Sequence, residues 1–244
     1  MSPDSKAPLL VSVQIGQPTN YGSDAAPDPH DHPWTTAFYK KPIEGEVFVS
    51  STNIAGDCQA DTKHHGGVHK AVLAYSADHY PEWREALHLP DMPHGAFGEN
   101  LTIQGLSEES VCIGDIFRIG SVTFEVSQPR QPCWKLARRW RMHELVAITV
   151  RNGRTGWYFR VLEEGLIQPG LPVELLDRPN PNWSVARANQ IMHFRRTDIA
   201  ALLALSEVPK LSPAWVQELH EHADQLQAAV ASDSLAPEPV RNSE

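Results

Sequence analysis

The chain has 244 residues, of which 41% are hydrophobic and 21% are charged, and this is the composition of an ordinary globular protein. Its formal net charge of −9 argues against non-specific nucleic-acid binding as its main task. The chain has three cysteines and no CxxC pair, so no disulfide framework is expected. The N-terminus shows no leader pattern, and no apolar run approaches the roughly 20 residues that span a membrane. These features predict a cytoplasmic protein.

Residues 1–181 are predicted to form one β-rich body. Residues 9–15 resemble a first strand, and a mobile loop rich in proline and histidine is expected at 23–34. Glycine or aspartate breaks then separate short β-branched runs. Strands are expected at 45–51, 70–76, 100–106, 115–128 and 171–176, and helices at 76–87 and 136–148. Many short strands with few helices favour a closed or nearly closed β-barrel over a doubly wound sheet.

The composition changes after Pro181, and residues 182–230 are predicted to form a small three-helix domain. The expected helices are 184–193, 197–206 and 212–229, with Ser184, Thr197 and Ser212 as N-caps. Pro213 stands at the first position of the third helix, where proline is tolerated. A small core is expected to be buried between the helices by Ile199, Leu202, Leu203, Val208, Trp215, Leu219 and Leu226. An exposed Trp215 and exposed leucines would suit a homodimer contact. Residues 231–244 are polar and are expected to form a flexible tail.

The stretch SQPRQPCWKL (residues 127–136) places a cysteine among prolines and basic residues. Pro129 and Pro132 fix their own φ angles, so Cys133 is expected on a rigid, extended loop. Five basic residues and no acidic residue lie between positions 130 and 141; they are Arg130, Lys135, Arg138, Arg139 and Arg141. Positive charge favours a thiolate, which attacks electrophiles or binds soft metals. The alternative is a core cysteine followed by the solvated face of a helix.

A second stretch, GDCQADTKHHGGVHKAV (residues 56–72), contains His64, His65 and His69. A zinc site is disfavoured because no second Cys or His cluster stands at a standard spacing. Gly66 and Gly67 can adopt positive φ, so their amides can bind an anion beside Lys70. The alternative is a tight turn before the next strand.

A third stretch, GAFGENLTIQGL (residues 95–106), places Asn100 beside a strand. Its amide can pair with the edge of a heterocycle, or it can hold a loop, which is the commoner use of such asparagines. The chain has no Walker loop, no GxGxxG and no GxSxG, so a Ser-His-Asp hydrolase has no support.

In chain order the stretches are 56–72, 95–106 and 127–136, with VCIGD (residues 111–115) between the last two, and together they resemble the MOSC domain, which is named for the C-terminal domain of molybdenum cofactor sulfurase. The segment TTAFYKKPIEGEV and the three-helix tail look like the YiiM-like branch. The resemblance extends from about residue 9 to residue 229. It implies a MOSC-type β-barrel body, a molybdenum cofactor (molybdopterin) with a phosphate tail and one cysteine that ligates the metal or carries sulfur. Cys133 matches the family's PxxPC position, and Cys58 and Cys112 do not.

The resemblance also implies a chemistry and a set of site residues. Related MOSC proteins reduce N-hydroxylated compounds, such as hydroxylaminopurines, with electrons from a separate flavin-containing reductase. Cys133 is the expected catalytic residue and molybdenum ligand. The expected cofactor-binding residues are Lys40, His65, Gly66, Gly67, Lys70, Asn100, Ser127, Arg130 and Cys133. Family members commonly have aspartate where this chain has His69. The predicted role of Lys70 therefore depends on whether His69 can do what that aspartate does.

Two alternatives to the reductase remain open from the sequence. Cys133 can instead carry a persulfide in a sulfur-transfer or cofactor-carrier protein without redox turnover. The chain can also be an interaction module without enzymatic activity, with the three helices as its docking element. A family-level label of pyridoxal phosphate binding is given little weight. No partner nucleic acid or membrane is expected.

Overall fold

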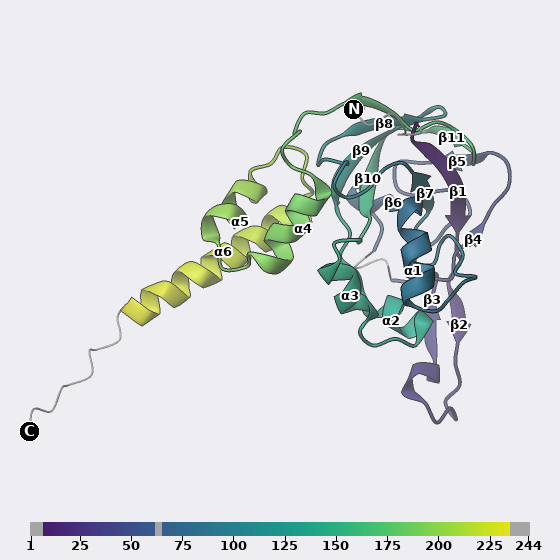
Figure 1. Cartoon of the computed structure of the whole chain (residues 1–244), viewed down its shortest axis with the longest axis horizontal. Coiled ribbons are helices and arrows are strands. Elements are labelled where there is room, and N and C mark those ends of the chain that lie inside the picture. Colours follow the sequence, from purple (N-terminus) through teal and green to yellow (C-terminus); the bar gives the residue numbers. More distant parts are fainter. Residues whose placement is uncertain (1–6, 62–64, 235–244) are drawn as a thin grey trace, which may run out of the picture.

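The body of the protein is built on one curled sheet of eight strands (Figure 1). The computed structural model describes residues 7–61 and 65–234. In sheet order the strands are β12 (Glu174–Asp177), β8 (Ile116–Ile119), β9 (Val122–Pro129), β10 (Trp157–Glu163), β6 (Val72–Ser76), β7 (Leu101–Gln104), β1 (Leu9–Ile15) and β4 (Lys41–Pro42). Neighbouring strands are antiparallel except β6 and β7, which are parallel.

The sheet curls until its two ends nearly meet. Leu9 of β1 bridges Pro172, which stands just before β12. The Leu10 amide donates to the Leu171 carbonyl at 2.9 Å, and the Gly170 amide donates to the Leu10 carbonyl at 2.7 Å. These bonds occupy backbone groups that an open edge would expose. The prediction of a mainly β body, a nearly closed barrel with a few helices, is confirmed.

Strand β9 lies in the hydrophobic core of the barrel, and all eight of its residues are buried. Its neighbour β10 supplies Phe159, whose ring centroid lies 5.1 Å from that of Phe124 and 6.3 Å from that of Trp157. Burying one such side chain contributes about 1.5–3 kcal/mol. The loop that follows Pro129 therefore begins from a firmly packed strand.

Shorter elements surround the barrel. Two strand pairs are β5 (Val47–Val49) with β11 (Gly165–Ile167) and β2 (Thr19–Tyr21) with β3 (Trp34–Thr36). The helices of the body are α1 (Tyr80–Ala86), α2 (Trp134–Trp140) and α3 (Leu145–Arg151), and its 3-10 turns are η1 (Pro29–Asp31), η2 (Val68–Lys70) and η3 (Ala77–His79). A second apolar cluster, which includes Tyr75, Trp83, Phe97 and Leu136, packs beneath α1, α2 and α3.

Two local predictions for the body are wrong in detail. The helix expected at 136–148 is two helices, because Arg141 takes a left-handed conformation with φ of 53° and ends α2. The loop expected at 23–34 holds η1, which Asp28 caps by accepting from the amide of His30. Arg138 donates to two carbonyls of this segment, so it is fixed against α2.

The three C-terminal helices lie to one side of the barrel (Figure 1). They are α4 (Val185–Phe194), α5 (Ile199–Ser206) and α6 (Pro213–Ser234). Ser184 caps α4 as predicted, whereas Asp198, not Thr197, caps α5. The Ser212 hydroxyl accepts from the amide of Trp215 in the first turn of α6. The flexible tail expected at 231–244 is helical as far as Ser234, and residues 235–244 lie outside the described residues.

Trp215 is buried in the core, as predicted from its place among the apolar residues of the helical domain, and the second expectation, that an exposed Trp215 serves a dimer contact, is wrong. Its side chain is only 1% exposed, because it packs with α4 and α5. The same apolar cluster contains Val126 of β9 and Leu219 of α6, so the helices share a continuous core with the barrel. The helical domain is therefore anchored to the strand that leads to Cys133.

Candidate functional site

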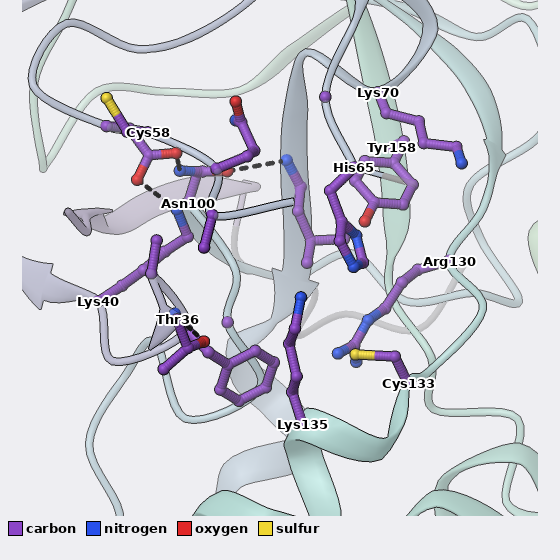
Figure 2. A pocket seen from close by; sticks show the side chains of 18 of the residues that line it. Thr36, Lys40, Cys58, His65, Lys70, Asn100, Arg130, Cys133, Lys135 and Tyr158 are labelled. Atoms are coloured by element: carbon purple, nitrogen blue, oxygen red, sulfur yellow. Dashed lines mark hydrogen bonds and ion pairs between the residues drawn. The ribbon is translucent and has the colours of Figure 1, made fainter. Parts of the chain in front are cut away.

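A pocket opens where the loops after β3, β5 and β9 converge (Figure 2). Its space is about 660 Å³ when the open solvent at its mouth is included. Seven of the nine residues predicted to bind the cofactor line it: Lys40, His65, Gly66, Lys70, Asn100, Arg130 and Cys133. Residues that are up to 93 positions apart in sequence, from Lys40 to Cys133, thus meet in one place. The functional role of each remains a prediction.

One wall of the pocket comes from the end of β9 and the start of α2. Pro132 favours extended backbone before it, and Cys133 is itself extended, with φ of −110° and ψ of 166°, at the N-cap position of α2. Its thiol is half-buried and lines the pocket. Figure 2 shows Arg130 beside Cys133 and Lys135 reaching into the space from α2. We call Arg130, Cys133 and Lys135 the cationic wall.

Arg130 is the most unusual group in the cationic wall. Its side chain is 3% exposed, and its Nη2 atom donates to the Phe97 carbonyl at 2.9 Å. Its Nη1 atom is buried without a hydrogen-bond partner among the described residues. An unpaired buried guanidinium nitrogen costs free energy unless an acceptor reaches it. The geometry therefore suits an anion that enters the pocket.

His65 lies in the same electrostatic environment. Burial, reinforced by the nearby charge of Lys135, lowers its pKa to about 4, although Asp61 acts in the opposite direction. The imidazole is therefore neutral at pH 7 and can offer one donor and one acceptor to a ligand. Lys70 lines the pocket nearby, at the end of η2.

The opposite wall consists of Lys40, Asp57 and Asn100, which we call the bonded wall. The Lys40 ammonium donates to Asp57 Oδ1, which also accepts from the Gly16 amide at 2.7 Å. Asn100 Nδ2 donates to Asp57 Oδ2 at 2.9 Å, and Asn100 Oδ1 accepts from the Leu73 amide at 3.2 Å. Burial lowers the pKa of Lys40, against the opposing effect of Asp57. Asn100 thus holds the fold together at this point while its side chain borders the pocket.

Gly66 has φ of +84°, and a Cβ atom there would lie 3.1 Å from Gln59 Oε1, so both its conformation and its surroundings favour glycine.

Two predicted site residues do not line the pocket. Gly67 is exposed, with φ of +81°, and precedes η2. Ser127 is fully buried behind the wall, where its hydroxyl donates to the carbonyls of His69 at 2.6 Å and Tyr158 at 3.1 Å. Ser127 therefore supports the turn that carries Lys70.

His69 shows how the chain accommodates the departure from the family pattern. Its Nδ1 atom lies 2.9 Å from Arg160 Nη2 and 3.1 Å from Arg160 Nε, outside the pocket lining. Burial and the Arg160 charge lower the pKa of His69. A neutral imidazole can accept a hydrogen bond from Arg160. His69 thus buttresses the turn before Lys70. His64 lies outside the described residues.

The basic run predicted around Cys133 divides into two groups. Arg130 and Lys135 line the pocket, whereas Arg138, Arg139 and Arg141 do not. Arg138 and Arg139 donate to backbone carbonyls of residues 30–38 and 95. Arg141 forms an ion pair with Asp31. The basic run therefore does not act at the pocket as a whole, since three of its five residues fasten α2 to neighbouring loops.

Several pocket residues escaped the sequence analysis as site candidates, and Asp57, Tyr158 and Cys58 are three of them with ionisable side chains. Asp57 belongs to the GDCQAD motif, and nothing in its own position within that motif indicates a role in the site. Tyr158 comes from β10, a strand that was not predicted, and burial raises the pKa of its phenol. Cys58 also lines the pocket and is exposed (Figure 2). Within residues 7–61 and 65–234, no three His, Cys, Asp or Glu side chains gather to hold a metal ion, so a metal here would depend on few protein ligands.

The fold and the pocket together define a class of protein. It is a nearly closed β-barrel with a helical appendage and a pocket in which a cysteine thiol lies beside positively charged side chains. The model of the MOSC domain family matches residues 61–174, and that of the YiiM-like, 3-alpha helix domain matches residues 183–222. The uncharacterized protein YflK of Bacillus subtilis is 44% identical over 217 residues, which cover 89% of this chain and 95% of YflK. The chain belongs to the MOSC domain family, in its YiiM-like branch.

Two further comparisons extend this result. The crystal structure of YiiM from Geobacillus stearothermophilus superposes with a TM-score of 0.74 at 34% identity, over 88% of this chain and 99% of that one. A protein of Gibberella moniliformis named Reductase is 43% identical over 178 residues. That match covers 72% of this chain and 32% of the longer relative. In the described part of the chain, no helix is long and apolar enough to cross a membrane.

Proposed function

We propose that this protein is a cytoplasmic, molybdenum-cofactor-dependent reductase of N-hydroxylated compounds, with Cys133 as the metal ligand. The observation that carries the proposal is the half-buried Cys133 thiol beside Arg130, whose Nη1 atom is buried without a partner among the described residues. Family membership and the relative named Reductase support the same chemistry.

The residues of the pocket fit the proposed cofactor. A thiolate is a soft ligand suited to a metal that also holds oxo groups. The cofactor has an anionic phosphate tail, and Arg130 Nη1 is a buried donor without an acceptor in the described chain. Lys135 adds a second positive charge from the first turn of α2 and forms no ion pair with a described residue. Cys133 would hold the metal, while Arg130, Lys135 and Lys70 would hold the anionic tail.

The net reaction of a hydroxylamine is R–NHOH + 2e⁻ + 2H⁺ → R–NH₂ + H₂O. When bound, the cofactor supplies the two-electron reduction that breaks the N–O bond, with electrons from a separate flavin-containing reductase. The chain's own residues would bind the substrate and supply protons. The Tyr158 phenol is protonated at pH 7, since the ordinary pKa of a tyrosine already lies well above 7 and burial raises it further. The neutral His65 imidazole can accept a hydrogen bond from the substrate.

The test is the reduction of 6-hydroxylaminopurine by the full chain produced in a molybdenum-replete host, with a chemical reductant as electron source. Molybdenum per protein is measured in the same samples. We expect turnover with bound molybdenum, and we expect Cys133→Ala to lose at least about 100-fold in activity together with its metal. Cys58→Ala is the matched control, since this second thiol also borders the pocket, and it should retain both.

Two outcomes would contradict the proposal in different ways. Bound cofactor without turnover of any N-hydroxylated compound would favour a carrier of sulfur or of the cofactor. An absence of cofactor from both the wild type and the variants, in a host that loads another molybdenum enzyme, would rule out both and leave a non-enzymatic interaction module.

A further inference from the structure

The loop between α5 and α6 touches the strand that leads to Cys133. We call residues 207–212 the α5–α6 corner. The Ser212 amide donates to the Ser127 carbonyl at 2.9 Å, and the Ser212 hydroxyl donates to Gln128 Oε1 at 2.7 Å. Ser212 is fully buried, and Gln128 is 2% exposed. These bonds join the corner to the last residues of strand β9, just before the cationic wall.

A second connection reaches the turn that carries Lys70. Arg160 of β10 forms an ion pair with Glu125 of β9 and donates to the His69 imidazole. The same guanidinium donates to the Lys210 carbonyl of the corner at 3.2 Å. Lys210 Nζ also lies 3.4 Å from Glu125. Arg160 thus links three parts of the molecule: the corner, β9 and the turn η2.

A third connection comes from α6 itself. Gln131 stands between Arg130 and Cys133 and lines the pocket, and its Nε2 atom donates to the Glu218 carboxylate at 3.0 and 3.2 Å. Glu218 is exposed on α6 and does not line the pocket. The loop that presents Cys133 is therefore held from the helical domain at two points, just before it at Gln128 and within it at Gln131.

The backbone of the corner is strained in a way that fits this arrangement. Lys210 has φ of +76°, a conformation that costs a non-glycine residue about 1–2 kcal/mol. Such a residue persists where its neighbours fix it. Here the Lys210 carbonyl and ammonium are both engaged, by Arg160 and Glu125 respectively.

We propose that the α5–α6 corner is a positioning element that fixes the Cys133 loop and the His69–Lys70 turn, and so sets the two sides of the pocket relative to each other. The helical domain then contributes to the site without lining it. This role does not depend on the identity of the cofactor, because it concerns the accessibility and placement of the Cys133 thiol in the chain itself.

The first experiment measures how fast a small aromatic disulfide reagent modifies Cys133 in the full chain without cofactor. A Cys58→Ser background removes the other exposed thiol, and Cys133→Ser identifies the signal. Ser212→Ala should raise the rate about fivefold, because the loss of one net hydrogen bond of about 1 kcal/mol shifts the loop toward open states. Ser206→Ala is the control. Its hydroxyl donates to the Leu203 carbonyl inside α5, and the residue is 6% exposed.

The control separates positioning from general loosening, since both variants lose a buried serine hydroxyl from the same helical domain. A rate in Ser212→Ala equal to that in Ser206→Ala would overturn the proposal. If Ser212→Ala does not fold by circular dichroism, Glu218→Ala decides in its place. Its exposed bond to Gln131 is worth less than 1 kcal/mol, so the expected rise is about twofold. Glu221→Ala, which loses an exposed bond to Gln217 on the same helix, should leave the rate unchanged.

Discussion

The two walls of the pocket differ in how their charged groups are bonded. In the bonded wall, Lys40 and Asp57 pair with each other, and Asn100 and the Gly16 amide complete the set. In the cationic wall, Arg130 has one bonded and one unbonded nitrogen, and Lys135 pairs with no described residue. The comparison indicates that the first wall is a scaffold that the fold needs. The second wall holds charges whose hydrogen-bonding capacity the described part of the chain does not fill.

The largest test of this comparison removes the centre of the bonded wall. Asp57→Ala should lower the free energy of unfolding by about 3 kcal/mol, because it leaves the Lys40 ammonium buried without its partner. Urea unfolding at pH 7 measures this. The double variant Lys40→Met, Asp57→Ala should recover much of the loss, since no charge is then left unpaired. An equal loss in both variants would show that Asp57 acts through its bonds to Gly16 and Asn100 instead.

In the cationic wall, a substitution should change the free energy of unfolding little and the binding of the cofactor strongly. Arg130→Met should change the free energy of unfolding by no more than about 1 kcal/mol, because the lost bond to Phe97 is offset by the removal of a half-satisfied buried charge. The cofactor retained after dialysis should fall by about 10- to 100-fold, the value of one charge-assisted hydrogen bond. A strong loss of stability with normal cofactor content would mean that Arg130 belongs to the scaffold.

A smaller effect distinguishes residues within the basic run. Lys135→Gln should weaken cofactor retention by about threefold to tenfold, because it removes one partly exposed charge from the pocket. Arg138→Gln removes an equal charge one turn further along α2, where the guanidinium bonds to the carbonyls of His30 and His32. It should leave retention unchanged. Equal effects of the two variants would mean that the charge of the run acts at long range and that the side-chain positions matter little.

The sequence predicted the body, the helical domain and nine cofactor-binding residues, of which seven line the pocket, because each rests on a local pattern. Short β-branched runs, N-caps and the three motifs are readable without the fold. It could not divide the basic run, because a charge on α2 may face the pocket or a loop, and only the packing of residues 30–38 against that helix decides. It predicted Trp215 both as part of the small core of the helical domain and as an exposed dimer contact, because the sequence alone does not show how completely three short helices cover a large side chain. The fold buries this residue.

The last prediction uses His65, which lies near the charges of the cationic wall. Its pKa in the folded chain is about 4, below the ordinary value of 6.5, because it is buried and lies near Lys135. The neutral form is therefore favoured by folding. The resulting stability is fully present above pH 6.5 and is lost as the pH falls through this window toward 4, where the folded imidazole also takes up a proton.

Replacing His65 with glutamine should therefore flatten the decline of the unfolding free energy between pH 6.5 and pH 4. His69, His94 and His193 also have pKa values lowered by burial, so part of the slope should remain. His220→Gln, on the exposed face of α6, is the control and should leave the slope unchanged. The combination with Lys135→Gln sharpens the comparison of the walls. If Lys135 raises the cost of protonating His65, its removal should reduce the slope in the wild-type background and have no effect on it once His65 is absent.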